Sequence, residues 1–126
     1  MPNRPERLCS LNLLLWDLGT AAKRIQNFVS GKSWNDYSND LLLRSGVERQ
    51  FEIAGEAMSK LRRVDTHTTE LIPNVHKIIG MRNILIHGYA QVNDQTVWRT
   101  ATENLDEIVA SVDVLLEKLG RPDRSV

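Results

Sequence analysis

The stretch Trp98 to Leu119, WRTATENLDEIVASVDVLLEKL, indicates the fold class most clearly. Its apolar residues recur in steps of three and four, at Trp98, Ala101, Leu105, Ile108, Val112, Leu115 and Leu119. This spacing places one apolar stripe along one face of an α-helix. Gly120 and Pro122 follow, and both residue types commonly end helices. We therefore expect a long amphipathic helix that packs against other helices.

Two earlier segments have the same periodicity. The first stripe consists of Leu8, Leu11, Leu15, Leu18, Ala22, Ile25 and Val29, and the second of Val47, Phe51, Ala54, Met58 and Leu61. Asn3 with Glu6 suits the start of the first helix and Gly31 its end. Ser38, Asn39 and Asp40 are cap candidates for the second helix, which Gly46 and Gly55 locally weaken.

A shorter helix is expected between Pro73 and Gly88, because proline suits a first helical turn and glycine a helix end. Residues 33–37 are expected to form a single turn, and residues 64–72 a connector. The prediction is an all-α, antiparallel, up-and-down four-helix bundle with one or two short extra helical turns. Residues 1–120 form its single domain, and residues 121–126 a polar tail.

Composition limits the function classes. The chain has 126 residues, and its 16 Lys and Arg balance 16 Asp and Glu. A balanced charge argues against coating nucleic acid through a global field, so any RNA contact must be local. Cys9 is the only cysteine, which fits a reducing compartment, although it leaves a disulfide between chains open. No run of about 18 apolar residues is present, so we expect a cytoplasmic protein without a membrane span.

The segment Met81-Arg82-Asn83-Ile84-Leu85-Ile86-His87-Gly88-Tyr89 carries most of the expected chemistry. Asn83 and His87 are four residues apart and share a helix face, where the amide can hold the imidazole. Arg82 is about 140° away from His87 around a helix, a gap that its long side chain can close. Arg82 also falls in an apolar stripe, and a buried arginine needs an anionic partner. A purely structural interpretation pairs Arg82 with Glu52 or Glu56 and makes His87 a helix cap.

The motif resembles that of the HepT-like (DUF86) branch of the HEPN superfamily. Glu52-Ile-Ala-Gly-Glu-Ala57 and Val97-Trp98 also match this branch, and the resemblance covers nearly the whole chain. Val75-His76 departs from it, because many relatives have tryptophan followed by a basic residue there.

The resemblance implies a dimeric endoribonuclease that is the toxin of a toxin–antitoxin pair, with a minimal nucleotidyltransferase as antitoxin. Arg82 and His87 would then be catalytic and Asn83 supporting. Tyr89 would accept AMP from the antitoxin. A tyrosine ring packed against the turn is the structural alternative for Tyr89.

Chemistry supports these assignments without requiring a metal or cofactor. Attack by an RNA 2′-hydroxyl on its own phosphate needs a base, an acid and positive charge near phosphorus. Histidine titrates near neutral pH, and arginine can grip a phosphate with two hydrogen bonds. Because one chain supplies one such histidine, we expect a homodimer to place two Arg82 and two His87 residues in a shared cleft.

Other sequence patterns are weaker evidence for function than this motif. The spacing of His67, His76 and His87 does not match a zinc site. Trp34, Tyr37 and Trp98 can stack on bases, but large aromatic residues in a small bundle are more often core. Two alternatives to a ribonuclease remain: a non-catalytic helical module that binds a nucleotide and partners a nucleotidyltransferase, and a bare interaction bundle.

Overall fold

The computed structural model describes residues 4–88 and 92–122, and in these ranges the chain forms seven α-helices and no strand. The helices are α1 (Arg4–Val29), α2 (Trp34–Ser38), α3 (Leu41–Val64), α4 (Thr66–Glu70), α5 (Val75–His87), α6 (Asp94–Glu103) and α7 (Leu105–Leu119). The expected all-α class is confirmed. Asn3 and residues 123–126, for which a cap and a polar tail were predicted, lie outside the described residues.

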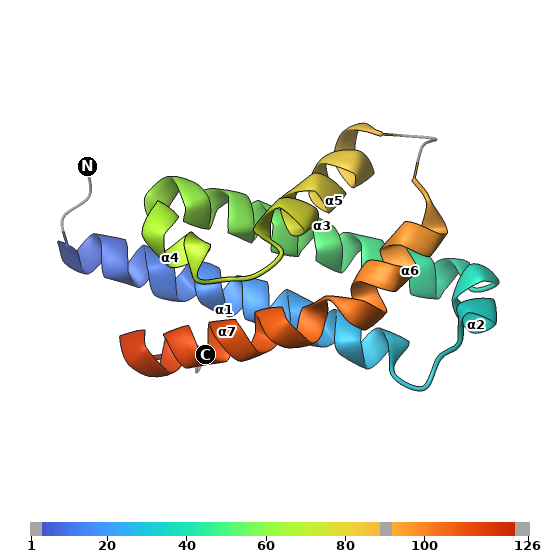
Figure 1. Ribbon diagram of the computed structural model, residues 1–126, viewed down its shortest axis with the longest axis horizontal. Helices are drawn as coiled ribbons and strands as arrows, with labels where there is room; N and C mark the ends of the chain where they lie inside the picture. Colours follow the sequence, from blue (N-terminus) through green and yellow to red (C-terminus); the bar gives the residue numbers. More distant parts are fainter. Residues whose placement is uncertain (1–3, 89–91, 123–126) are drawn as a thin grey trace.

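The long helices α1 and α3 lie side by side and run in opposite directions (Figure 1). Helix α7 packs on α1, and α5 packs on α3 with its C-terminal end pointing away from the body of the molecule (Figure 1). The predicted stripes supply the core. Leu15, Ile25, Val47, Phe51, Met58, Leu61, Ile108 and Val112 are fully buried. None of the described helices is long and apolar enough to cross a membrane.

Short polar side chains fix where the helices begin. Ser33 and Asp36 form a capping box that starts α2, and the Asp40 carboxylate accepts the Leu43 N–H at 3.0 Å to start α3. Asp65 likewise caps α4, a short helix within the segment for which a connector was predicted. Gly31 follows α1 with φ of 72°, the left-handed conformation in which glycine is favoured. These caps turn the chain at the bundle ends.

Two predicted helix bounds were wrong, and both errors involve asparagine. The single helix expected over Trp98 to Leu119 is divided at Asn104 into α6 and α7. The Asn74 amide donates to the Asn104 carbonyl at 3.3 Å, and the Lys77 ammonium donates to the Asn104 side chain at 3.4 Å. Both contacts hold Asn104 against the start of α5, at the point where α6 ends and α7 begins. An asparagine whose polar groups have such partners favours an interruption over a continuous helix. Asn74 itself is left-handed, with φ of 63°, so α5 begins at Val75 rather than near Pro73.

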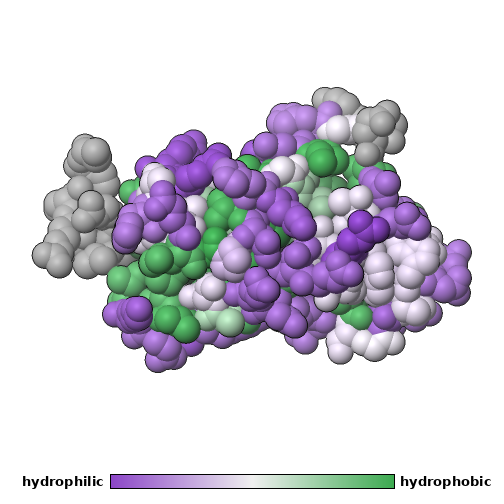
Figure 2. Space-filling model, viewed as in Figure 1, coloured by the Kyte–Doolittle hydropathy of each residue, from purple (hydrophilic) through white to green (hydrophobic). Residues whose placement is uncertain are grey.

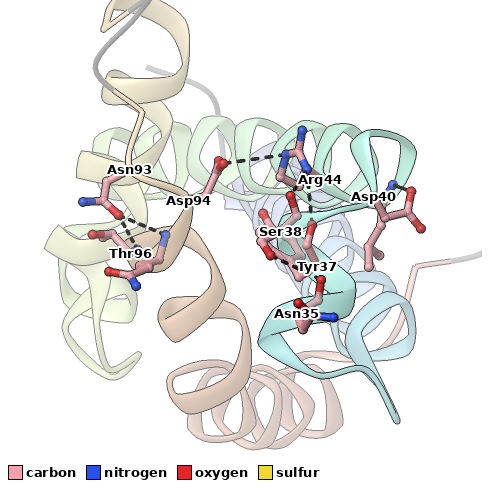
Figure 3. A network of polar contacts seen from close by, with 10 residues as sticks. Asn35, Tyr37, Ser38, Asp40, Arg44, Asn93, Asp94 and Thr96 are labelled. Carbon is pink, nitrogen blue, oxygen red and sulfur yellow. Dashed lines mark hydrogen bonds and ion pairs between the residues drawn. The ribbon is translucent and has the colours of Figure 1, made fainter.

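Arg44 ties the start of α6 to the junction of α2 and α3. Its guanidinium donates to the carbonyl of Ser38 at 2.7 Å and lies 3.7 Å from the carboxylate of Asp94 (Figure 3). Asn93 then caps α6 by accepting the N–H groups of Gln95 and Thr96. The end of the segment that follows α5 is therefore anchored to the bundle.

Glu48 lies in the same neighbourhood and gives a pH-dependent prediction. Burial raises the pKa of Glu48, as does the negative charge of Asp94, against the opposing charge of Arg44. The folded chain therefore binds this proton more tightly than the unfolded chain, so stability falls as pH rises above about 4.5 through the raised pKa. We expect Glu48→Gln to raise the free energy of unfolding at pH 7 by less than about 1 kcal/mol after solvent screening, and to change it little at pH 4.

Thermal unfolding at both pH values measures this difference. Glu107→Gln is the matched control, since Glu107 is exposed on α7 and surface substitutions usually change stability by less than about 0.5 kcal/mol. If Glu48→Gln stabilised the protein as much at pH 4 as at pH 7, the result would contradict a stability cost from the ionised Glu48 carboxylate.

Candidate active site

Gly55 brings α5 unusually close to α3. A Cβ atom at Gly55 would overlap the Cβ of Arg82 and lie 3.1 Å from the carbonyl oxygen of Ile78. Only glycine fits this crossing without moving one of the helices. The sequence argument treated Gly55 as a weak point of its helix and missed this role. Its position on the apolar face, beside the buried Ala54, was the available signal.

The crossing lays the stem of Arg82 against α3, and one acceptor from α3 and one from α5 hold its guanidinium. Nη2 of Arg82 lies 2.7 Å from Oε2 of Glu56, and Nη1 donates to Oδ1 of Asn83 at 3.3 Å. The Arg82 side chain is 25% exposed, and its Nε is buried without an acceptor among the described residues. Of the two carboxylates proposed as partners, Arg82 pairs with Glu56, while Glu52 pairs with Arg49 at 3.1 Å.

Glu56 remains ionised because of its surroundings. Burial on its own would raise the pKa of Glu56, but the charge of Arg82 and the hydrogen bond and charge of Lys60 lower it overall. Lys60 Nζ lies 3.4 Å from the Glu56 carboxylate. A charged acceptor therefore faces Arg82 at neutral pH. The contact both orients the guanidinium and competes with any phosphate that approaches it.

His87 is exposed at the last position of α5, and the Gly88 N–H closes the helix by donating to the Ile84 carbonyl at 2.6 Å. Asn83 is exposed as well, but its amide oxygen accepts the hydrogen bond from Arg82. Among the described residues, no hydrogen bond joins Asn83 to His87, and none joins Arg82 to His87. The structure thus brings together Arg82, Asn83 and Glu56 and leaves the imidazole separate. Tyr89 lies outside the described residues.

An open groove of about 260 Å³ runs beside the Arg82–Glu56 pair. It is formed by α1, α3 and the outer end of α5 and is lined by Leu14, Asp17, Arg49, Glu52, Ile53, Glu56, Ala57, Lys60 and Ile86. Its charges are of both signs. Within residues 4–88 and 92–122, no group of three or more His, Cys, Asp or Glu side chains is arranged to hold a metal ion.

Comparison with known proteins matches this sequence to one family. The family model described as Ribonuclease HepT-like matches residues 18–115. A "Putative RNase" of Methanocaldococcus jannaschii is 30% identical over 80% of this chain and 92% of its own length. A "Putative RNase" of Caldanaerobacter subterraneus is 33% identical over 71% of this chain and 80% of its own length. A "Probable ribonuclease HepT" of Thermococcus cleftensis is 26% identical over 80% and 91%. No solved structure matches significantly.

Proposed function

This chain belongs to the HepT-like ribonuclease family, and we propose that it is a metal-independent endoribonuclease whose catalytic residues are Arg82 and His87. The observation that carries the proposal is the contrast between these two side chains on one helix. Arg82 is fixed by Glu56 at 2.7 Å, while His87 is exposed and unpaired within the described part of the chain. The pair combines an oriented cation with an imidazole that is open to solvent.

The proposed reaction uses both groups. The RNA 2′-hydroxyl attacks the adjacent phosphorus, and the bond from phosphorus to the leaving 5′-oxygen breaks. A histidine accepts the proton of the 2′-hydroxyl, and a histidine supplies a proton to the 5′-oxygen. Arg82 stabilises the negative charge on the phosphorane oxygens, with Asn83 supporting its orientation. The products are a 2′,3′-cyclic phosphate and a 5′-hydroxyl.

A homodimer would supply the two histidines that these steps require. The surface around His87 supports this part of the proposal, because Ile84 is 45% exposed and Ile86 is 37% exposed on the same helix. Figure 2 shows some hydrophobic atoms (green) among hydrophilic ones (purple) near the outer end of α5. Exposed apolar side chains at a helix end gain from burial in an interface, and a twofold axis would bring the two α5 ends together.

Cleavage of RNA by the purified chain in EDTA is the direct test. We expect fragments that end in 2′,3′-cyclic phosphates. We also expect the cleavage rate per chain to fall when the protein is diluted below the dissociation constant of the dimer. Mass spectrometry of the fragment ends and sedimentation at matched concentrations measure the two quantities. A requirement for added divalent metal would contradict metal independence, and an undiminished rate in dilute monomer would contradict the shared cleft.

We also propose that the chain is the toxin of a toxin–antitoxin pair and that a minimal nucleotidyltransferase antitoxin inactivates it by attaching AMP to Tyr89. The transferase forms a phosphodiester with the tyrosine oxygen and releases pyrophosphate from ATP. Tyr89 is two residues beyond His87. An adenylyl group there adds bulk and a negative phosphate that Arg82 can bind in place of RNA.

Incubation with the transferase and ATP should add AMP to the wild-type chain and abolish cleavage, whereas Tyr89→Phe should remain unmodified and active. Intact-mass measurement and the cleavage assay follow the two effects. Tyr37→Phe is the control, because Tyr37 is fully buried and should not alter the mass gain. AMP attached elsewhere, or cleavage that survives modification of Tyr89, would contradict the proposal.

One observation favours a second candidate function, a non-catalytic helical module that binds a nucleotide and partners the nucleotidyltransferase. The ion pair with Glu56 already satisfies part of Arg82, as a structural arginine requires. Absence of cleavage from every RNA tested, together with tight binding to the transferase, is the result that distinguishes this module from the enzyme.

A further inference from the structure

A small polar hollow between α2 and α6 has no part in the proposed cleavage site. Its volume is about 200 Å³, and it is lined by Trp34, Gln95, Trp98, Arg99, Thr102 and Glu103. Trp34 comes from α2 and the other five residues from α6. These helices lie at the end of the bundle where α1 joins α3 (Figure 1). The hollow is therefore a separate feature of the surface, and all its lining residues lie in helices.

Two indole rings in this hollow are held in place by a third aromatic ring. Tyr37 is fully buried, and its ring centroid lies 6.1 Å from that of Trp34 and 5.2 Å from that of Trp98. Both distances are typical of packed aromatic pairs. Tyr37 is thus core, as the sequence predicted, but Trp34 and Trp98 keep part of their surface exposed and line the hollow. A flat ligand could stack there with little additional ordering of side chains.

The polar residues of the hollow are available to a ligand. Arg99 and Gln95 are exposed, and their side chains make no hydrogen bond or ion pair within residues 4–88 and 92–122. A guanidinium can bind a phosphate, and a carboxamide offers both a donor and an acceptor to the edge of a base. Glu103 supplies an additional acceptor for an amino or hydroxyl group. Aromatic faces beside a cation are the usual combination in sites for single-stranded nucleic acid.

We propose that this hollow is a stacking subsite for one base of a single-stranded RNA, with Arg99 contacting the neighbouring phosphate. The choice of RNA as ligand rests on the proposed ribonuclease function, whereas the hollow itself does not involve Arg82 or His87. The subsite would hold a nucleotide outside the scissile position. It would therefore contribute to binding of the strand rather than to the chemical step.

Tryptophan fluorescence tests the subsite without any cleavage. The chain contains three tryptophans, so a Trp16→Phe background leaves Trp34 and Trp98 as the reporters. The ligand is a 2′-O-methyl hexaadenylate, which lacks the hydroxyl needed for cleavage, and AMP is tested separately. We expect saturable quenching by the hexanucleotide and weaker binding of AMP. Arg99→Gln should weaken binding of the hexanucleotide and reduce its salt dependence by about one phosphate contact.

Ring removal gives the second arm. We expect Trp98→Leu to weaken binding by roughly tenfold, measured by anisotropy of a labelled hexanucleotide, and Trp98→Phe by less, because phenylalanine keeps a stacking face. Circular dichroism shows whether each variant is folded. If Trp98→Leu does not fold, Arg99→Gln is the variant that tests the subsite. Arg63→Gln is the matched control, since Arg63 is exposed at the far end of α3.

Three results would overturn the subsite. The first is a reporter signal that does not change with hexanucleotide. The second is binding that Arg99→Gln and Arg63→Gln weaken equally. The third is AMP binding as tight as that of the hexanucleotide, which would make the hollow a site for a free nucleotide. If the chain binds the hexanucleotide as expected but cleaves no RNA, the result would contradict the proposed ribonuclease function and still support the subsite.

Discussion

We expect the His87→Ala variant to cleave RNA about 10²- to 10⁴-fold more slowly than the wild-type chain, because a positioned general acid or base contributes this much to proton transfer. The side chain is exposed at the end of α5, so its removal should leave the fold intact. Single-turnover cleavage of a labelled RNA, with circular dichroism as the check on folding, measures the loss. His76→Ala, which removes an exposed histidine from the first turn of the same helix, is the matched control.

Arg82 variants divide the effect of charge from that of structure. Arg82→Ala removes the ion pair with Glu56 and should lower cleavage by about 10²- to 10³-fold, as expected for the loss of one stabilising group near the phosphorane. Arg82→Lys keeps the charge but loses the second nitrogen that contacts Asn83.

Cleavage by His87→Ala at the wild-type rate, or equal losses in His87→Ala and His76→Ala, would contradict the catalytic role of His87.

The Gly55→Ala variant should be the most damaging single methyl addition along α3. The new Cβ would overlap the Cβ of Arg82, and neither backbone can move without separating α5 from α3. Overpacking of this kind usually costs about 1–3 kcal/mol of unfolding free energy. We also expect cleavage to fall, because a displaced α5 carries Arg82 away from Glu56. Urea unfolding and the cleavage assay measure the two effects.

Gly80→Ala is the control for Gly55→Ala, since it makes the same change within α5. Among the described residues, and apart from the chain neighbours of Gly80 and the adjacent backbone of α5, no heavy atom lies within 4 Å of a Cβ built at Gly80. A helical glycine with free space around it should gain up to about 1 kcal/mol on substitution by alanine. Opposite signs for the two variants would support the close crossing. Stabilisation by Gly55→Ala would show that α5 does not approach α3 as described.

The sequence predicted the helical frame well because the frame depends on apolar periodicity. The stripes from Leu11 to Val29 and from Val47 to Leu61 are buried along their lengths, and the Asp40 cap lies where it was expected. The break at Asn104 could not be predicted from that periodicity. The residues that contact Asn104 at the break, Asn74 and Lys77, are 30 and 27 residues away in the chain.

Prediction of the site was less complete, for a related reason. The spacing of Arg82, Asn83 and His87 identified one helix end, and the need of a buried arginine for an anion reduced its partners to Glu52 and Glu56. Choosing Glu56 required the relative rotation of α3 and α5, which no local pattern encodes. The proposed hydrogen bond from Asn83 to His87 is absent from the described residues because the Asn83 oxygen faces Arg82 instead.

The placement of α5 also has a consequence for the order of assembly. Helix α5 packs mainly on α3, and α3 is in turn supported by α1. Glu56 lies on α3, so the carboxylate that pairs with Arg82 is synthesised before Arg82 itself. During synthesis α1 and α3 emerge before α5, so the residues against which α5 packs are already available when α5 emerges.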